Sequence, residues 1–85
     1  MKLKLFTQPN CPNCPPAREL AKQLERRGIK VEHWNIDEVD GLAESAFHSV
    51  SATPALVLVN GSEEEIKKWE GSAPSADEVL KALKV

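Results

Sequence analysis

The two cysteines of this 85-residue chain are Cys11 and Cys14, which gives the spacing C-x-x-C. They lie within TQPNCPNCPPA (7–17), a stretch that also contains four prolines. Two thiols this close together can form a structural disulfide, contribute to a metal site, or cycle between a dithiol and a disulfide. The rest of the sequence has to distinguish these three uses.

An apolar stripe with the helical spacing i, i+3, i+4, i+7 follows the cysteines, and consists of Ala17, Leu20, Ala21 and Leu24. It predicts a helix that begins at Cys11 or Cys14 and runs to Arg27, with Gly28 just beyond its end. The first turn of a helix has unpaired backbone N–H groups and partial positive charge, which stabilise a thiolate. We therefore expect the pKa of the first thiol to lie below its free value.

The order of the two thiols suggests their roles. Cys11 lies nearest the helix start and should be the more exposed, so we assign it as the attacking thiol. Cys14 lies one helical turn later, where it can stay mostly buried and still resolve a mixed disulfide. Between them, Pro12 suits the first position of a helix, and Asn13 is small enough to leave Cys11 accessible.

The other two uses of the spacing are less well supported. A zinc site needs four ligands, and the two histidines, His33 and His48, have no finger-like spacing. A structural disulfide across three positions would close a very small loop, which stabilises a fold little. We expect no metal and no cofactor, although a metal or iron–sulfur-binding module remains an alternative.

Four strands and two more helices complete the pattern. Strands are predicted at 2–6, 29–36, 55–59 and 66–69, the third being the continuous apolar run ALVLV, which suits a strand covered on both faces. A short helix capped by Asp40 should turn its apolar residues inward, namely Leu42, Ala43, Ala46 and Phe47. A capping box at 75–78 opens a last helix with Val79, Leu80 and Leu83 inward.

The predicted order is β-α-β-α-β-β-α, an α/β fold with a four-stranded mixed sheet and helices on both of its faces. A net charge of −2 argues against a nucleic-acid partner, and the longest apolar run is too short to cross a membrane. The N-terminus reaches Pro9 before a signal sequence could form, so we expect a cytoplasmic protein. Residues 1–85 should form one domain and act as a monomer.

Three further expectations concern single side chains. We interpret His33 as a residue of the sheet and His48 as a cation at a helix end. The acidic run from Glu63 to Glu65 is interpreted as a solvated turn.

A second motif is Ser51-Ala52-Thr53-Pro54, directly before the apolar strand. Together with Cys11-Pro12-Asn13-Cys14 after the first strand and Trp69-Glu70-Gly71 at the end of the last, it resembles the thioredoxin superfamily in its short, glutaredoxin-like form. The nearest resemblance is to glutaredoxin-like redoxins that supply electrons to ribonucleotide reductase. The resemblance covers nearly the whole chain. It implies a thiol–disulfide oxidoreductase, with Pro54 in the cis form and Thr53 docking the substrate.

Departures from the glutaredoxin pattern bear on the electron donor. Glutaredoxins usually have Lys or Arg where this chain has Gln8, an aromatic residue where it has Asn13, and a second glycine after the position of Gly71. Contacts to glutathione are therefore weakened. We expect an enzyme that reduces protein disulfides and is recharged by a thioredoxin-reductase-like flavoprotein, with glutathione-dependent activity as the alternative. An adaptor that only docks peptides at Thr53-Pro54 is a third, weaker reading.

Overall fold

A computed structural model describes residues 1–83 of the chain. The elements in chain order are β1 (Lys2–Thr7), α1 (Cys14–Arg26), β2 (Val31–Asn35), α2 (Val39–Phe47), β3 (Ala55–Val59), β4 (Glu65–Glu70) and α3 (Ala76–Leu83). This is the predicted order of strands and helices. No helix among the described residues is both long enough and apolar enough to cross a membrane.

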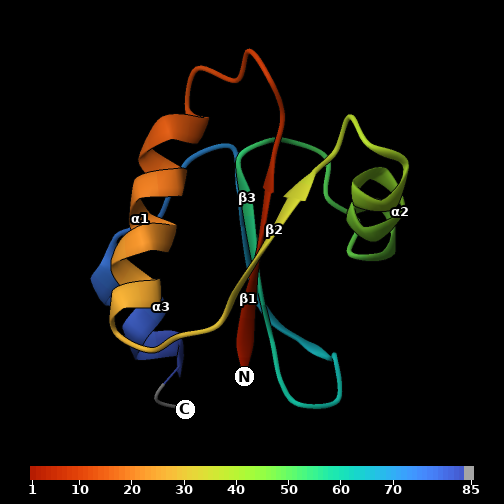
Figure 1. Ribbon diagram of the computed structural model, residues 1–85. Coiled ribbons are helices and arrows are strands. Elements are labelled where there is room, and N and C mark those ends of the chain that lie inside the picture. The colour runs from red at the N-terminus through yellow and green to blue at the C-terminus, as the bar shows by residue number, and fades with distance from the viewer. Residues whose placement is uncertain (84–85) are drawn as a thin grey trace.

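The four strands form one mixed sheet in the order β2-β1-β3-β4. β1 and β2 are parallel, as expected for strands joined through a helix, and β3 pairs antiparallel with both β1 and β4. Figure 1 shows α1 and α3 on one face of the sheet and α2 on the other. The predicted fold class is therefore confirmed.

Alternate side chains of the central strands point to opposite faces of the sheet. Leu3, Leu5, Leu56 and Leu58 pack with α1 and with Val79 of α3, whereas Phe6, Ala55, Val57 and Val59 form a second cluster with Trp34, Ile36 and Val50. All five residues of β3 are buried, because this strand has a neighbour on each side and packing on both faces. The prediction for ALVLV is confirmed.

The boundaries of several elements differ from the predictions by one or two residues. β2 is shorter than the predicted 29–36, and β4 is one residue longer at each end than the predicted 66–69. α1 begins at Cys14, the later of the two predicted starts, and ends at Arg26, with Gly28 beyond it at a positive φ of 85°. Glycine adopts this left-handed conformation without the strain that other residues would suffer.

The orientation predicted for α2 is wrong. Its inward face consists of Gly41 and Ser45, while Leu42, Ala43, Ala46 and Phe47 are exposed. The helix starts at Val39, and Asp40 lies in its first turn rather than at its cap. A Cβ atom at Gly41 would collide with the backbone carbonyl of Asn35, so only glycine lets the helix approach β2 this closely.

A buried lysine explains the polar inward face of α2. Lys4 points from β1 toward α2, is 3% exposed, and forms ion pairs with Glu44 and with Glu63, the latter at 2.9 Å. Burial alone would lower the pKa of Lys4, but its hydrogen bonds to these carboxylates outweigh burial and raise it. The sheet thus requires carboxylates, rather than apolar side chains, above Lys4.

The surroundings of Lys4 correct the expectations for two residues, His48 and Glu63. His48 is 4% exposed, and burial together with the positive charge of Lys4 lowers its pKa, which disfavours the charged form expected of a helix-end cation. Glu63 is not simply part of a solvated turn. Its backbone has a positive φ of 63°, and its carboxylate binds both Lys2 and Lys4. His33, by contrast, lies on β2 as expected.

Candidate functional site

The two cysteines form a disulfide at the N-terminal end of α1, with their Cα atoms 5.3 Å apart. The loop that carries them connects the end of β1 to the start of α1 (Figure 1). Cys14 is completely buried, whereas Cys11 is partly exposed. The expected difference in exposure between the two cysteines is confirmed.

The local sequence explains why α1 starts at Cys14. Asn13 is its N-cap residue, and Pro15 and Pro16 fall in the first turn, where backbone N–H groups have no partner within the helix. Two consecutive prolines therefore cost no helical hydrogen bond here, although they would break the helix one turn later. The N–H of Cys14 donates to the Cys11 carbonyl over 3.3 Å, which closes the loop around the disulfide.

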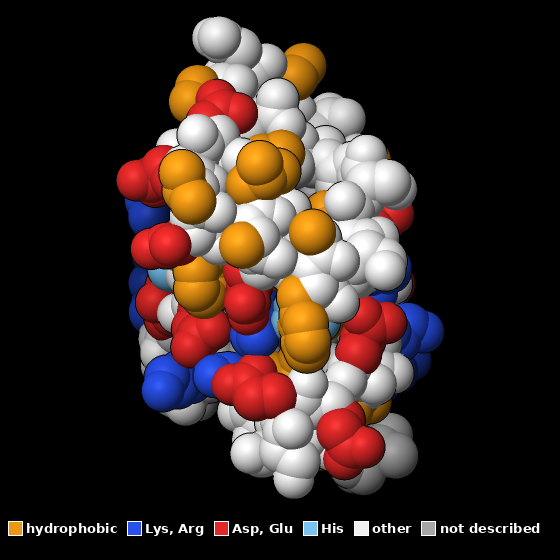
Figure 2. Space-filling model, turned by 90° about the vertical axis from the view of Figure 1, so that its right-hand side faces the viewer, with side chains coloured by type: hydrophobic (Ala, Val, Ile, Leu, Met, Phe, Trp, Pro, Cys, Tyr) orange, Lys and Arg blue, Asp and Glu red, His pale blue; other side chains and the backbone are white. Residues whose placement is uncertain are grey.

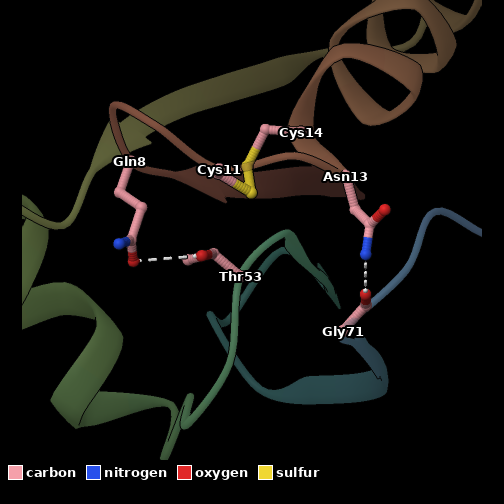
Figure 3. The surroundings of a disulfide bond; sticks show 6 residues. All are labelled: Gln8, Cys11, Asn13, Cys14, Thr53 and Gly71. Carbon is pink, nitrogen blue, oxygen red and sulfur yellow. Dashed lines mark hydrogen bonds between the residues drawn. A yellow bond between two sulfur atoms is a disulfide. The ribbon is translucent and has the colours of Figure 1, made fainter.

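The loop before β3 lies across from the disulfide. Its Thr53–Pro54 peptide bond is cis, which confirms that prediction, and Pro54 is fully buried. Thr53 is partly exposed, and Figure 3 shows it on the same side of the site as Gln8. The sequence thus brings Thr53 and Pro54 to the site, although they are about forty residues from the cysteines in the chain.

Two side-chain hydrogen bonds join the cysteine loop to its neighbours (Figure 3). The Thr53 hydroxyl donates to the Gln8 side-chain carbonyl over 3.0 Å. On the other side of the disulfide, the Asn13 amide donates to the Gly71 carbonyl over a longer distance of 3.4 Å. The N–H of Gly71 in turn donates to the Pro54 carbonyl over 2.9 Å. Three separate loops are thereby held around one disulfide.

Gly71 is the member of this arrangement that the sequence analysis did not identify as part of the site. Its φ of 85° lets the chain turn at the end of β4, directly beside the cysteine loop and the proline loop. The tripeptide Trp69-Glu70-Gly71 contained the signal, because a glycine that ends a strand marks a turn with a special backbone conformation. The turn at Gly71 reaches the site only because β4 pairs with β3, which the local sequence does not reveal.

Pro12 and Asn13 are both exposed and follow the partly exposed Cys11 in the loop. Within residues 1–83, no group of three or more His, Cys, Asp or Glu side chains is arranged to hold a metal ion. The structure describes the oxidised state, in which the Cys11 and Cys14 sulfurs are bonded to each other. The chemistry that this arrangement supports directly is reversible reduction of the disulfide.

Comparison with known proteins agrees with this chemistry. Residues 1–84 match the family described as "Thioredoxin domain". The chain is 28% identical to a thioredoxin of Methanocaldococcus jannaschii over 87 aligned positions, which cover 99% of this chain and 93% of the relative. It is 29% identical to a probable thioredoxin of Methanothermobacter marburgensis, with 98% and 92% covered.

The solved structures show the same fold. Thioredoxin 1 from Thermosipho africanus superposes with a TM-score of 0.68 at 23% identity, covering 99% of this chain and 91% of that one. At this level of identity, the likeness concerns the arrangement of strands and helices alone.

Proposed function

Because the chain belongs to the thioredoxin family and is a dithiol thiol–disulfide oxidoreductase, we propose that it reduces disulfide bonds in proteins through Cys11 and Cys14. The observation that carries the proposal is the unequal exposure of two bonded sulfurs at a helix start. An exposed first thiol can meet a large substrate, and a buried second thiol is protected from side reactions until it is needed.

In the proposed reaction, the reduced Cys11 thiolate attacks one sulfur of the substrate disulfide. A mixed disulfide forms between Cys11 and the substrate, and the other substrate sulfur leaves as a thiolate that takes up a proton. The Cys14 thiolate then attacks the Cys11 sulfur and releases the second substrate thiol. Two electrons pass to the substrate, and the enzyme is left with the Cys11–Cys14 disulfide, the state that the structure describes.

The proposed substrate-binding residues are Pro12, Asn13, Thr53 and Pro54. Main-chain groups of Thr53 form no hydrogen bond with another described residue, while its side chain is held by Gln8. An extended segment of the substrate could therefore pair with the Thr53 backbone as an added strand pairs with a sheet edge. Asn13 and Pro12 would contact the substrate on the other side of Cys11.

For the electron donor, we propose a thioredoxin-reductase-like flavoenzyme rather than glutathione. Gln8 replaces the cation that would attract a glutathione carboxylate, and its side-chain carbonyl already accepts a hydrogen bond from Thr53. The two sequence relatives described above, which are called thioredoxin and probable thioredoxin, also support this choice. We further propose that residues 1–85 act as one monomeric domain in the cytoplasm, where such a dithiol is kept reduced.

The test of the donor offers the oxidised protein two complete reducing systems. One contains NADPH and a thioredoxin reductase, and the other contains NADPH, glutathione and glutathione reductase. Loss of NADPH absorbance should occur with the first system and not with the second. Reduction by glutathione alone would overturn the proposed donor while leaving the dithiol chemistry intact.

The test of the dithiol mechanism uses two matched variants. Cys14→Ser should accumulate covalent adducts with disulfide-containing proteins such as insulin, because the mixed disulfide is no longer resolved. Cys11→Ser should form none, since the remaining thiol is buried. If Cys11→Ser formed adducts as readily as Cys14→Ser, the assigned order of the two thiols would be wrong.

A further inference from the structure

The face of the molecule formed by α2 exposes a row of apolar side chains. Val39 is 84% exposed, Leu42 58% and Phe47 71%, and Ala43 and Ala46 are exposed between them. Their spacing of three to four residues places them on one side of the helix. Figure 2 shows hydrophobic side chains gathered on this face, with acidic side chains beside and below them. We call the five residues 39, 42, 43, 46 and 47 the α2 strip.

The exposure of the α2 strip is fixed by the other side of the helix. Gly41 lies against the backbone of Asn35 and leaves no room for a side chain. Glu44 forms its ion pair with the buried Lys4, and His48 is buried just after the helix. Turning the α2 strip inward would expose Lys4 without its partner and bring larger side chains against β2. The helix therefore presents its apolar side to the outside as a property of the fold.

The surroundings of the α2 strip are acidic. Residues 31–66 contain no Lys or Arg, and three exposed carboxylates lie next to or within the strip, namely Asp37, Glu38 and Asp40. Among the described residues, none of these three forms a salt bridge. Three lysines reach this face, and each is paired with a glutamate: Lys2 and Lys4 with Glu63, and Lys68 with Glu70.

A groove runs beside Phe47 at one end of the strip. Phe47, Trp34 and the stems of Lys2 and Lys4 line it together with Glu44 and Glu63. A second hollow that also includes Phe47 is lined by His48, Ser49, Glu65 and Lys68, again with Glu63. Phe47 thus borders two depressions, each lined by one more glutamate than lysine, a shape that can receive side chains of a partner beside an aromatic ring.

From this combination of apolar strip and acidic rim, we infer that α2 is a docking surface for a partner protein that presents apolar side chains flanked by Lys and Arg. A second copy of this chain would bring two acidic rims together, which is unfavourable. Anionic lipid and nucleic acid would be repelled for the same reason. This surface lies on the opposite side of the sheet from α1, so the inference goes beyond the redox function and does not depend on it.

The probe for the test is a synthetic amphipathic helical peptide with Leu and Phe on one face and Lys at the flanks. It is titrated into the ¹⁵N-labelled, oxidised full chain, and amide chemical shifts are followed. We expect saturable changes confined to residues near 37–48 and 63–65, with affinity that falls as salt is added. A matched peptide with Glu in place of every Lys should bind at least about tenfold more weakly.

Two variants test whether the peptide binds through the α2 strip. Val39→Ser combined with Leu42→Ser should weaken binding by about tenfold or more, because both side chains are exposed and their loss leaves the core unchanged. Ile66→Ser is the control, since Ile66 is a similarly apolar and exposed residue on β4, outside the α2 strip. Its affinity for the peptide should equal that of the unchanged protein.

Several results would overturn the inference. One is equal affinity for the Lys peptide and the Glu peptide. Another is a loss of affinity in Ile66→Ser as large as in the Val39→Ser/Leu42→Ser variant. A third is the absence of any chemical-shift change when the Lys peptide is added. Self-association detected by sedimentation equilibrium, with shift changes at the α2 strip, would make a second copy the occupant instead. Binding to vesicles of phosphatidylcholine and phosphatidylglycerol through the same residues would make a membrane surface the occupant.

Discussion

The Thr53 hydroxyl donates a 3.0 Å hydrogen bond to the side-chain carbonyl of Gln8, a residue 45 positions earlier in the chain. This contact ties the loop that contains the cis-proline to the loop that contains the cysteines. Without it, the two loops would be linked only through the strands and through the hydrogen bonds that join Asn13, Gly71 and Pro54. The bond therefore has consequences for both stability and catalysis.

A double-mutant cycle should reveal this coupling. Thr53→Val keeps the shape of the side chain but removes its donor, and Gln8→Met removes the acceptor. Each change should lower the free energy of unfolding by about 1 kcal/mol, and the pair should cost less than the sum, with a coupling of about 0.5–1.5 kcal/mol. Urea unfolding of the oxidised protein measures the stabilities. Strictly additive losses would show that the two side chains do not stabilise each other.

The close approach of α2 to β2 gives a second prediction. Gly→Ala normally favours a helix, but at Gly41 the new methyl group would collide with the Asn35 carbonyl. We expect Gly41→Ala to destabilise the fold by about 1–3 kcal/mol, the usual cost of overpacking. Ala46→Gly, at an exposed position of the same helix, should cost only about 0.5–1 kcal/mol. Thermal unfolding compares the two, and a stabilised Gly41→Ala protein would mean that α2 sits further from the sheet.

The pH dependence of stability should report on Glu63. Hydrogen bonds from Lys2 and Lys4 lower the pKa of its carboxyl from 4.5 to about 2. A carboxyl with a lowered folded-state pKa contributes stability above its unfolded value and loses that contribution as the pH falls toward 2. The stability difference between the unchanged protein and Glu63→Gln should therefore be largest above about pH 5 and shrink below it.

The control for this pH series is Glu19→Gln, because Glu19 is exposed on α1 and has no salt bridge to a described residue. The difference in free energy of unfolding between Glu19→Gln and the unchanged protein should vary less between pH 5 and 2. Equal pH dependence of the two variants would indicate that Glu63 contributes no more than an ordinary surface carboxylate.

Replacing the buried Lys4 should have two separable effects. Lys4→Met leaves Glu44 without its lysine partner and Glu63 with Lys2 alone, so we expect a loss of roughly 1–3 kcal/mol in the free energy of unfolding. The positive charge of Lys4 also lowers the pKa of His48, so that pKa should rise in the variant. Urea unfolding and an NMR titration of the imidazole measure these effects. Lys22→Met, on the exposed face of α1, should produce neither.

The sequence was sufficient for the sheet and for the redox pair. Alternating or continuous apolar runs locate the strands, and the cysteine spacing before an apolar helical stripe locates the disulfide. These signals are local, and each is repeated over several residues. The sequence leaves the exact start of α1 open between Cys11 and Cys14, and the structure begins the helix at Cys14.

The orientation of α2 could not be predicted from its own residues. An amphipathic pattern normally points its apolar side to the core, but here the sheet beneath the helix contains the buried charge of Lys4. The inward face must then supply a carboxylate and a residue without a side chain, which Glu44 and Gly41 do. That requirement comes from β1, more than thirty residues away. Gly71 was missed at the site for a similar reason, since only strand pairing brings it there.

The position of β1 between β2 and β3 affects how the molecule opens. Its main chain pairs on both sides and its residues 3–6 are buried, so we expect its amide hydrogens to exchange with solvent only when the whole fold unfolds. β2 and β4, at the edges of the sheet, can open locally at lower free energy. The cysteine loop begins just after the last residue of β1. The disulfide loop, whose bonding changes in every proposed turnover, is therefore attached directly to one of the two central strands, which we expect to exchange most slowly.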